Sequence, residues 1–339
     1  MVRLLKLKRK IGVSCSAGGH LTEALLALNG INDEDIFLVT FRTEYLKEFE
    51  KKYRFYYVPN PFELKNGLFL LIIKLILNIA LSFYIFFKEK PALIFSTGAG
   101  VAIPFCIIGK LFGSKLVYLE TGASVKDLSK TGKLVYKLTN DFFVQWKELT
   151  EKYTKAKCTS ILSNIKILRE TKRNDINFSQ ILIVGFVGTL PFDRLVLSLK
   201  NISDKYGFKL CIQSSNTGVT FDNSNKKIVN FSFVSYSTML QWIKSADIIV
   251  THGGYGTILN CIICGKIPIA FPRDPSLGEH RHEQIELLEK LSQLELIDLV
   301  SDTSILEKKI LEKIREQKKI FATINLSFAM YLKEILEEK

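Results

Sequence analysis

The chain has 339 residues, of which 47% are hydrophobic and 24% charged, enough for two domains that each bury a core, and this composition excludes a disordered protein. Lys and Arg outnumber Asp and Glu by 47 to 34, and the net charge of +13 favours anionic partners such as nucleotide phosphates, nucleic acid or an acidic membrane surface. Nucleic acid is the weakest of these, because the sequence has no zinc-finger pattern, no aromatic RNA-binding signature and no arginine-rich helix.

The six cysteines are scattered through apolar segments without a disulfide framework, which indicates a reducing cytosol. Cys261 and Cys264 form a CxxC inside an apolar stretch with no second pair, so core packing is a better interpretation than zinc binding. The basic start MVRLLKLKRK leads into a predicted strand and a glycine turn, so we do not expect a signal peptide.

The first 60 residues alternate predicted strands and helices. We expect strands at 10–14, 36–40 and 55–58, and helices at 21–28 and around 44–51. The turn after the first strand, CSAGGH, contains Gly18, Gly19 and His20. This alternation predicts a parallel, doubly wound sheet.

The stretch from Leu68 to Phe87 is apolar and has the length, about 20 residues, that a helix needs to cross a bilayer. However, Lys74, Asn78 and Ser82 recur every four residues and line one face. Strands of one sheet are also expected before and after it, and a single crossing would separate them. We therefore predict a monotopic helix or a helical hairpin in the cytoplasmic face of the membrane, with a buried core helix as the alternative. The basic residues expected at anionic headgroups are Lys65, Lys74, Lys88 and Lys90.

A second glycine loop follows the strand expected at 92–96. It consists of Thr97, Gly98, Ala99 and Gly100 and leads into a helix that begins at Val101. The next strand, 115–119, ends at Glu120, which places a carboxylate at the edge where ligands of open α/β sheets bind, although a helix cap is the alternative for such a residue. A polar loop at 129–132 and a strand at 141–146 complete this domain.

The chain becomes polar and loses periodicity over 158–179, which predicts a linker. Alternation then resumes, with strands expected at 181–188, 209–213, 228–234 and 246–250 and a single charged amphipathic helix from Ser304 onward. The predicted division is a first domain at 1–160, a linker at 161–178 and a second domain at 179–339.

The strongest single motif is THGGYGT, which follows the strand expected at 246–250. Its glycines let the backbone approach a ligand, and the helix that follows presents unpaired N–H groups and a partial positive charge, which suits a phosphate. An ordinary strand-to-helix turn is the alternative. The residues of interest are His252, Gly253, Gly254, Gly256 and Thr257.

All four histidines fall in loops associated with glycines, which indicates that at least one is functional. They are His20, His252, His280 and His282. Zinc is disfavoured, because the two last histidines and the neighbouring Glu279 and Glu283 have neither an HExxH helix nor a cysteine partner.

Seven motifs together resemble a known family. GGH at 18–20, STGAGVAIP at 96–104, YLET at 118–121 and VQW at 144–146 resemble the acceptor-binding subunit of bacterial capsule and exopolysaccharide glycosyltransferases. VGTLPFDRL at 187–195, THGGYGTIL at 251–259 and PRDPSLGEHRHEQ at 272–284 resemble its donor-binding partner subunit. Both are related to the eukaryotic pair that adds the second GlcNAc to dolichol diphosphate and to the bacterial lipid II GlcNAc-transferase. The chain therefore resembles a natural fusion of the two subunits.

The resemblance implies an α/β protein of the GT-B fold, with two Rossmann-like domains facing across a cleft and a membrane-associated helix in the N-terminal, acceptor-binding domain. It implies an inverting, metal-independent hexosyltransferase without a cofactor, located at the cytoplasmic face of the plasma membrane. The donor would be a UDP-sugar, and the acceptor a saccharide on a polyprenyl diphosphate in surface polysaccharide synthesis. Galactose, glucuronic acid, glucose and GlcNAc all remain open as the sugar transferred.

The resemblance also implies residue roles. His20 and Glu120 are the candidates for the base that takes the acceptor proton, and His20 is preferred because its ordinary pKa of ~6.5 is near neutrality. The acceptor diphosphate is expected at Gly18, Gly19, Thr97, Gly98, Ala99 and Gly100. The donor is expected at His252, Gly253, Gly254, Gly256, Thr257, Arg273, Glu279, His280, Glu283 and Gln284.

The sequence departs from the family pattern at two positions. Asn260 stands where relatives commonly have Glu, so the ribose contact is expected to pass to Glu283. Phe186 stands where relatives tend to have a small polar residue, which argues against a role for that position.

Two other functions compete. A non-catalytic, membrane-associated UDP-sugar sensor would explain the phosphate loops and the apolar helix, but not the paired histidine and carboxylate loops. A nucleotide-dependent oxidoreductase would need GxGxxG after the first strand, a spacing that SAGGH does not supply.

Overall fold

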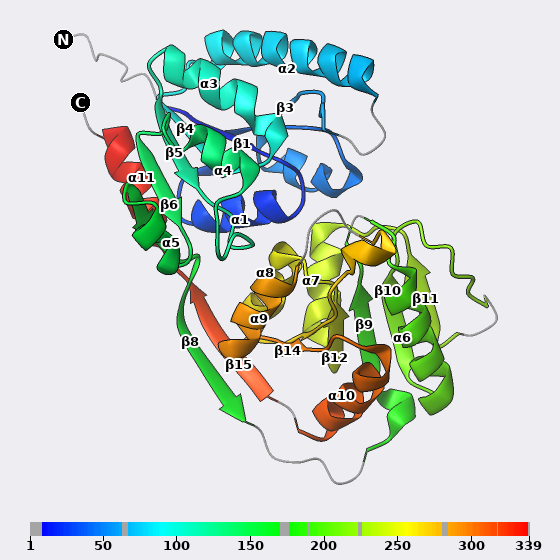
Figure 1. Ribbon diagram of the computed structural model, residues 1–339. Helices are drawn as coiled ribbons and strands as arrows, with labels where there is room; N and C mark the ends of the chain where they lie inside the picture. Colours follow the sequence, from blue (N-terminus) through cyan, green and yellow to red (C-terminus); the bar gives the residue numbers. More distant parts are fainter. Residues whose placement is uncertain are drawn as a thin grey trace. The chain divides into compact units, whose positions relative to one another are not determined.

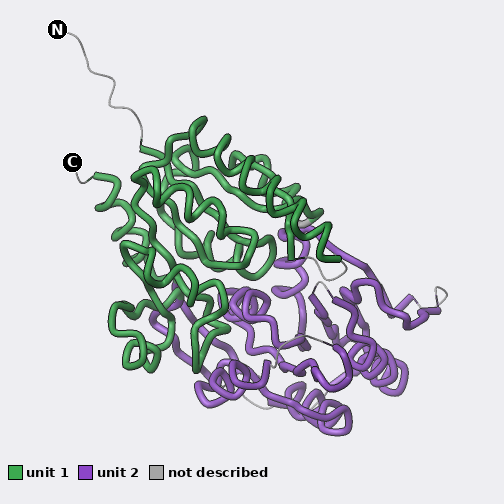
Figure 2. Tube along the Cα trace, turned by 45° about the horizontal axis from the view of Figure 1, so that its top comes forward, with its two compact units in different colours: residues 1–161, 324–339 green, residues 162–323 purple. Residues whose placement is uncertain are grey.

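The structure is a computed structural model that describes residues 9–62, 67–169, 176–188, 190–222, 226–279, 284–316 and 318–337. The chain divides into two compact units (Figure 2). Unit 1 comprises Met1–Ile161 together with Ile324–Lys339, and unit 2 comprises Leu162–Thr323.

Unit 1 is built on a seven-stranded parallel sheet with the order β3-β2-β1-β4-β5-β6-β7 (Figure 1). Its central strands are buried at every residue, as expected for a sheet covered on both faces. This confirms the predicted doubly wound sheet. The strands are β1 (Ile11–Cys15), β2 (Ile36–Thr40), β3 (Arg54–Tyr57), β4 (Leu93–Gly98), β5 (Lys115–Leu119), β6 (Asp141–Val144) and β7 (Ala156–Cys158).

Within its described residues, unit 1 contains six α-helices: α1 (Gly19–Ala27), α2 (Leu68–Glu89), α3 (Ile103–Leu111), α4 (Lys130–Val135), α5 (Glu148–Lys152) and α11 (Ser327–Glu337). Two local predictions were wrong. The helix expected around 44–51 is a pair of short 3-10 turns, and the loop expected at 129–132 starts α4, because the Ser129 hydroxyl caps it by accepting from the Gly132 N–H at 3.0 Å.

Unit 2 repeats the strand order of unit 1 in a six-stranded parallel sheet, β11-β10-β9-β12-β13-β14. Its strands are β9 (Leu182–Phe186), β10 (Lys209–Gln213), β11 (Ile228–Phe231), β12 (Ile248–Thr251), β13 (Ile269–Ala270) and β14 (Asp298–Leu299). Its helices are α6 (Asp193–Tyr206), α7 (Tyr236–Ser245), α8 (Tyr255–Ile263), α9 (Ile285–Gln293) and α10 (Thr303–Arg315).

The chain between and after the two sheets differs from the prediction. The stretch expected as a linker at 161–178 contains β8 (Leu162–Arg169), which pairs with β15 (Lys318–Ile324) in a separate two-stranded sheet. The segment from Ser304, which was expected to be a single helix, consists of α10, β15 and α11. The last helix, α11, packs on unit 1, where the Phe328 ring lies 5.3 Å from Phe95 and 5.0 Å from Phe143. An amphipathic pattern predicts that such a helix buries one face, but not which sheet it covers.

The long helix α2 lies alongside α3 (Figure 1), and two residues of its polar stripe point inward. Asn78 and Ser82 are fully buried. The Asn78 amide donates to the carbonyls of Pro59 at 3.0 Å and Val101 at 3.1 Å, and the Ser82 hydroxyl donates to the Asn78 side chain at 3.1 Å. At the end of the helix, hydrogen bonds from Lys10, Tyr56 and Arg54 outweigh burial and lower the pKa of Glu89 to about 2.

The outward side of α2 is apolar and exposed, and we call it the apolar face. It consists of Leu68, Phe69, Leu70, Ile72, Ile73, Ile76, Leu77, Ile79, Leu81, Phe83, Tyr84 and Phe87. Phe112, after α3, is exposed as well and its ring lies 5.1 Å from that of Phe87. By length and composition alone α2 is able to cross a membrane, with a mean hydropathy of 2.4 in its most apolar window.

Candidate functional site

Both sheets have their topological switch point between the two central strands, which are β1 and β4 in unit 1 and β9 and β12 in unit 2. Loops that leave the carboxyl ends of such strands diverge, and ligands of open α/β sheets bind between them. The predicted site residues at 18–20, 97–100 and 252–257 lie in these loops, at the carboxyl end of β4 or in the first turn of the helix that follows.

In unit 1 the loops after β1 and β4 are joined through His20. Its Nδ1 lies 2.8 Å from the Thr97 carbonyl oxygen, and the Thr97 hydroxyl donates to the His20 carbonyl at 2.8 Å. A carbonyl only accepts, so Nδ1 carries the proton and Nε2 keeps its lone pair. Burial lowers the pKa of His20 below its usual value, which keeps the ring neutral. The imidazole is therefore oriented as a base.

The loop after β4 adopts backbone conformations that side chains rarely take. Gly98 has φ of 113°, and Ala99 has φ of 74° with ψ of 148°, a region populated almost only by glycine. A side chain at Gly100 would meet the Phe62 ring. The loop thus presents bare backbone next to His20, as a site for a diphosphate requires.

Glu120, the other predicted catalytic residue, is fully buried just after β5. Its carboxylate accepts from the N–H groups of Thr121 at 3.0 Å and Ser129 at 3.1 Å, and from the hydroxyls of Ser129 at 3.1 Å and Ser124 at 3.3 Å. Burial raises the pKa of Glu120 to about 7, although these hydrogen bonds act to lower it. These contacts hold the segment 121–129 in place and leave Glu120 less suited than His20 to meet a substrate.

The sequence reasoning missed Glu23, which lies one helical turn after His20 in α1 and is buried. It accepts from the Thr121 hydroxyl at 2.6 Å, the Gly122 N–H at 2.9 Å and the Gln145 amide at 2.6 Å. Burial raises its pKa to about 7, and the nearby charge of Glu120 adds to this. A signal was present, because Glu23 shares a face of the predicted helix with the apolar Ala27, four residues later.

The motifs YLET and VQW are explained by this same network. Gln145 donates to Glu23 and also to the Glu120 carbonyl at 3.1 Å. The Trp146 indole donates to the Gly122 carbonyl at 2.7 Å. The motif residues therefore fix the loop after β5.

In unit 2 the loops after β9 and β12 are joined through His252. Its backbone N–H donates to the Phe186 carbonyl at 3.0 Å, and its Nδ1 lies 3.3 Å from the same oxygen. The ring lies between two glycines, because a side chain at Gly188 would come within 2.6 Å of it and one at Gly254 would also collide with it. Phe186 contributes its carbonyl while its side chain is buried in the core.

The first turn of α8 follows directly and contains Gly256 and Thr257. Its N-cap is Gly254, which has no side chain to accept from the N–H groups of this turn. A side chain at Gly253 would come within 2.9 Å of Gln284, so Gln284 lies against this loop. Asn260, on α8, is buried and accepts from the Tyr236 hydroxyl at 2.9 Å.

Arg273 lies in a position that does not suit the predicted phosphate contact. It is buried, and its guanidinium donates to the carbonyls of Val187 at 2.6 Å, Leu190 and Pro191 at 2.5 Å, and Glu279 at 3.0 Å. Burial lowers its pKa to about 10, so it remains charged at neutral pH. Arg273 therefore fastens the loop after β9 rather than reaching toward a ligand.

Glu279 is also engaged within the protein. Arg194 of α6 donates to both of its carboxylate oxygens, from Nε at 3.0 Å and from Nη2 at 2.8 Å, and the Asp274 N–H donates to it at 2.7 Å. This bidentate pair holds the segment after β13 against α6. The sequence reasoning had not singled out Arg194.

His280, His282 and Glu283 lie outside the described residues, so their predicted roles at the donor or at zinc stay predictions. Over the described ranges, no group of three or more His, Cys, Asp or Glu side chains is placed to hold a metal ion.

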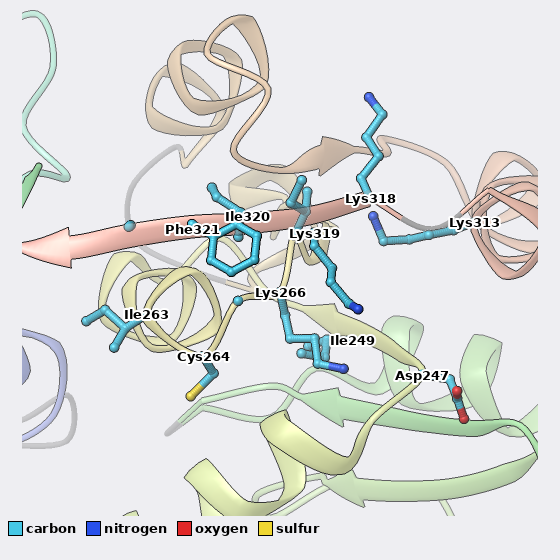
Figure 3. A pocket seen from close by; sticks show the side chains of 13 residues that line it. Asp247, Ile249, Ile263, Cys264, Lys266, Lys313, Lys318, Lys319, Ile320 and Phe321 are labelled. Atoms are coloured by element: carbon cyan, nitrogen blue, oxygen red, sulfur yellow. The ribbon is translucent and has the colours of Figure 1, made fainter. Parts of the chain in front are cut away.

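A cavity of about 480 Å³ in unit 2 lies away from these loops (Figure 3). It is lined by Asp247 and Ile249 at the amino end of β12, by the turn after α8 and by β15. Two of its lysines are bound within the protein, Lys313 to Asp298 and Lys266 to the Ala246 carbonyl at 2.7 Å. Since His252 follows the opposite, carboxyl end of β12, this cavity is separate from the glycine loop at 252–257.

The fold and the paired switch-point loops define the class, a GT-B protein with two Rossmann-like α/β domains. The crystal structure of Acinetobacter baumannii MurG is similar, with a TM-score of 0.58 at 14% identity, covering 90% of this chain and 91% of that one. UDP-GlcNAc 2-epimerase of Methanocaldococcus jannaschii, in complex with UDP-GlcNAc and UDP, has a TM-score of 0.62 at 14% identity, covering 97% and 99%. At such identities the likeness shows the fold alone, and the reaction has to be argued from the site.

More particularly, the chain joins an Alg14-like domain to a glycosyltransferase family 28 C-terminal domain. Residues 12–162 match the family described as "Oligosaccharide biosynthesis protein Alg14 like", and residues 181–338 match "Glycosyltransferase family 28 C-terminal domain". This confirms the predicted fusion.

Some relatives match one of these domains, and others match both. The human UDP-N-acetylglucosamine transferase subunit ALG14 is 31% identical over 111 residues, 31% of this chain and 51% of that protein. The chain thus spans about half the length of the ALG14 relatives it matches. The UDP-N-acetylglucosamine--N-acetylmuramyl-(pentapeptide) pyrophosphoryl-undecaprenol N-acetylglucosamine transferase of Borrelia hermsii is 24% identical over 325 residues, 87% of this chain and 88% of that protein.

Proposed function

We propose that the chain is an inverting glycosyltransferase that moves a sugar from a UDP-sugar to a saccharide linked to a polyprenyl diphosphate. The names of the relatives of each domain support both substrate classes. The observation that carries the proposal is the hydrogen bond between His20 Nδ1 and the Thr97 carbonyl, because it leaves Nε2 as a basic nitrogen beside a glycine loop.

Unit 1 supplies the acceptor chemistry in this proposal. Nε2 of His20 takes the proton of the acceptor hydroxyl as its oxygen forms the bond to the anomeric carbon, and UDP leaves with the electrons of the bond that breaks. General base catalysis of this kind contributes roughly 10²–10⁴-fold to the rate. Glu120 and Glu23 keep the loop after β5 in position, and the acceptor diphosphate binds at Gly18, Gly19 and the loop 97–100.

Unit 2 supplies the donor chemistry. The N–H groups at the start of α8 and the positive end of that helix offset the charge that develops on the leaving UDP, so no metal ion is needed. His252 orients the glycine loop, and the amide of Gln284 suits hydroxyls of the donor. Arg273 and Glu279 shape this site through the loops they fasten.

GlcNAc is the first donor sugar to test, since the relatives are named for its transfer. Galactose, glucose and glucuronic acid are the other members of the panel. A role in capsule or exopolysaccharide synthesis is part of the same proposal and rests on the motifs shared with those enzymes.

The membrane part of the proposal rests on α2. Its apolar face would lie in the cytoplasmic leaflet as a monotopic helix, while Asn78 and Ser82 attach the other side to the protein. The exposed Lys88 and Lys90 at its end suit anionic headgroups. Extraction of membranes with high salt and with carbonate tests this. The protein should resist both and dissolve in detergent, whereas release at low salt without detergent would exclude membrane insertion.

Acceptor-dependent release of UDP tests the function itself. The purified protein is incubated with each UDP-sugar in the presence or absence of a synthetic glucosyl-diphosphate lipid, with and without EDTA. We expect UDP release and a new lipid-linked disaccharide only when the acceptor is present, and no loss of rate in EDTA. A protein that binds UDP-sugars but never releases UDP with any lipid acceptor would be a sensor.

A further inference from the structure

Tyr118 has a buried hydroxyl that the proposed mechanism does not use. It lies on β5, it is 0% exposed, and its ring stacks on Phe142 with centroids 5.0 Å apart. Within the described residues, no group makes a hydrogen bond of good geometry to its hydroxyl, although the Ser129 hydroxyl lies near enough to lower its pKa. Leaving such a group unpaired costs about 1–3 kcal/mol, and buried polar groups without partners are rare.

The hydroxyl reaches the loop that holds His20. The point where a side chain of residue 98 would begin lies 2.6 Å from the Tyr118 hydroxyl and 3.4 Å from Cε1 of His20. Position 98 has φ of 113° and is a glycine, so no side chain separates the two groups. The phenol oxygen and Cε1 of the imidazole therefore both border the bare backbone of Gly98.

On its other side the hydroxyl belongs to the surroundings of Glu120. Residues 118 and 120 are two apart at the end of β5, so they point to the same side of the sheet. Burial, followed by the charge of Glu120, raises the pKa of Tyr118 well above its usual value, so the phenol stays neutral. The other titratable groups that act on it are Cys106 on α3 and Glu23 on α1.

We propose that Tyr118 is a positioning residue for His20, whose hydroxyl oxygen faces Cε1 and stabilises the positive charge that the imidazole acquires on accepting the acceptor proton. A Cε1–H group becomes a better donor when the ring is charged, so this contact is stronger in the protonated state. The inference rests on the proposed function, because it needs His20 as the base.

The test is Tyr118→Phe, which keeps the ring on Phe142 and removes only the oxygen. We expect kcat to fall roughly 3- to 10-fold with an unchanged KM for the UDP-sugar. The acid limb of the pH profile of kcat/KM should move down by roughly half to one pH unit, the equivalent of one hydrogen bond to a titrating group. Nitrogen-15 NMR of the histidines measures the pKa of His20 directly, and His20→Ala assigns its signal among the four histidines.

Tyr136→Phe is the matched control. Tyr136 packs on the same Phe142, also at 5.0 Å, but its hydroxyl accepts from the Lys155 N–H at 2.9 Å. It should leave kcat and the pKa of His20 unchanged. If Tyr118→Phe unfolds the protein, 3-fluorotyrosine at position 118 retains the hydroxyl with a less basic oxygen, and a smaller shift in the same direction is expected.

A folded Tyr118 variant with the parent's His20 pKa and acid limb would overturn the inference. The NMR measurement does not depend on activity. A protein without transferase activity in which Tyr118→Phe still lowers the pKa of His20 would therefore refute the proposed function and leave the contact between the two residues standing.

Discussion

The two units differ in which central strand of the sheet is followed by the histidine at the switch point. Both place a histidine at the switch point and bind its Nδ1 to a backbone carbonyl at the end of the other central strand. In unit 1 His20 follows β1 and contacts Thr97 of β4 at 2.8 Å. In unit 2 His252 follows β12, the counterpart of β4, and contacts Phe186 of β9 at 3.3 Å. The arrangement is therefore a property of this sheet topology, while the strand that carries the histidine is exchanged.

The buried charges around the two histidines differ in sign. Unit 1 has the carboxylates Glu23 and Glu120, with raised pKa values, and unit 2 has the guanidinium of Arg273. The topology thus places a histidine at each switch point, whereas the buried charges stabilise different loops. In unit 1 the carboxylates accept from the segment after β5, and in unit 2 the guanidinium donates to the segment after β9.

The largest expected difference is between the two histidines. His20→Ala should lower kcat/KM about 10²–10³-fold while UDP binding stays within about twofold, because a base is lost. His252→Ala should instead weaken UDP binding and raise the KM of the UDP-sugar. Steady-state kinetics and calorimetric titration with UDP separate the two outcomes. Equal losses of UDP binding in both variants would contradict the assignment of His20 to the acceptor and of His252 to the UDP-sugar.

The next largest effect concerns the stability of unit 2. Arg273→Met leaves the carbonyls of Val187, Leu190, Pro191 and Glu279 without their donor, so we expect a loss of about 3–5 kcal/mol in its free energy of unfolding. Arg273→Lys should be intermediate. Urea unfolding is followed through Trp242 of unit 2, in a background with Trp146→Phe. A loss below about 1 kcal/mol would point to a ligand-binding role for Arg273 instead.

A smaller effect is the pH dependence of the stability of unit 1. The pKa of Glu23 is about 7 in the folded protein against an ordinary 4.5, so the folded state binds a proton that the unfolded state has released between these values. The free energy of unfolding should therefore fall as pH rises from about 5 to 8, by a few kcal/mol at most. Glu23→Gln should flatten this slope in thermal unfolding. A steeper slope in the variant would contradict the raised pKa.

The smallest effect is expected in the loop after β4. Ala99→Gly relieves the strain of φ at 74° but makes the unfolded chain more flexible, so we expect a net gain of up to about 1 kcal/mol. Ala102→Gly is the control, since Ala102 has φ of −81° and gains no relief. It should lose about 0.5–1 kcal/mol. Differential scanning calorimetry measures both, and equal signs for the two variants would show that Ala99 is not strained.

Much of the fold follows from the sequence, because the strands of a doubly wound sheet are short, apolar and regularly spaced. The ranges predicted for β2, β5 and β10 agree residue by residue with the structure. The pairing of β8 with β15 and the packing of α11 on unit 1 do not follow, because both join segments that lie about 160 residues or more apart.

The site was predictable to a similar extent. Glycines and histidines in loops are conspicuous, so the positions of the loops with His20 and His252 could be read from the sequence. The roles of Arg273 and Glu23 could not, because a charged side chain in a polar or helical segment gives no sign of which carbonyls or hydroxyls surround it. Only the burial of Arg273 and Glu23 in the structure distinguishes a side chain that stabilises a loop from one that contacts a ligand.

The inward polar stripe of α2 means that this helix is not a detachable anchor. The Asn78 amide completes the hydrogen bonding of the Val101 carbonyl, in the turn that continues the loop 97–100. Deleting α2 to make the protein easier to handle would remove that donor and disturb the loop that faces His20. Under the proposed membrane role, lipid attachment and the geometry of this loop are coupled through the Asn78 amide. A variant that has an intact loop but does not bind lipid would have to keep Asn78 and make only the apolar face polar.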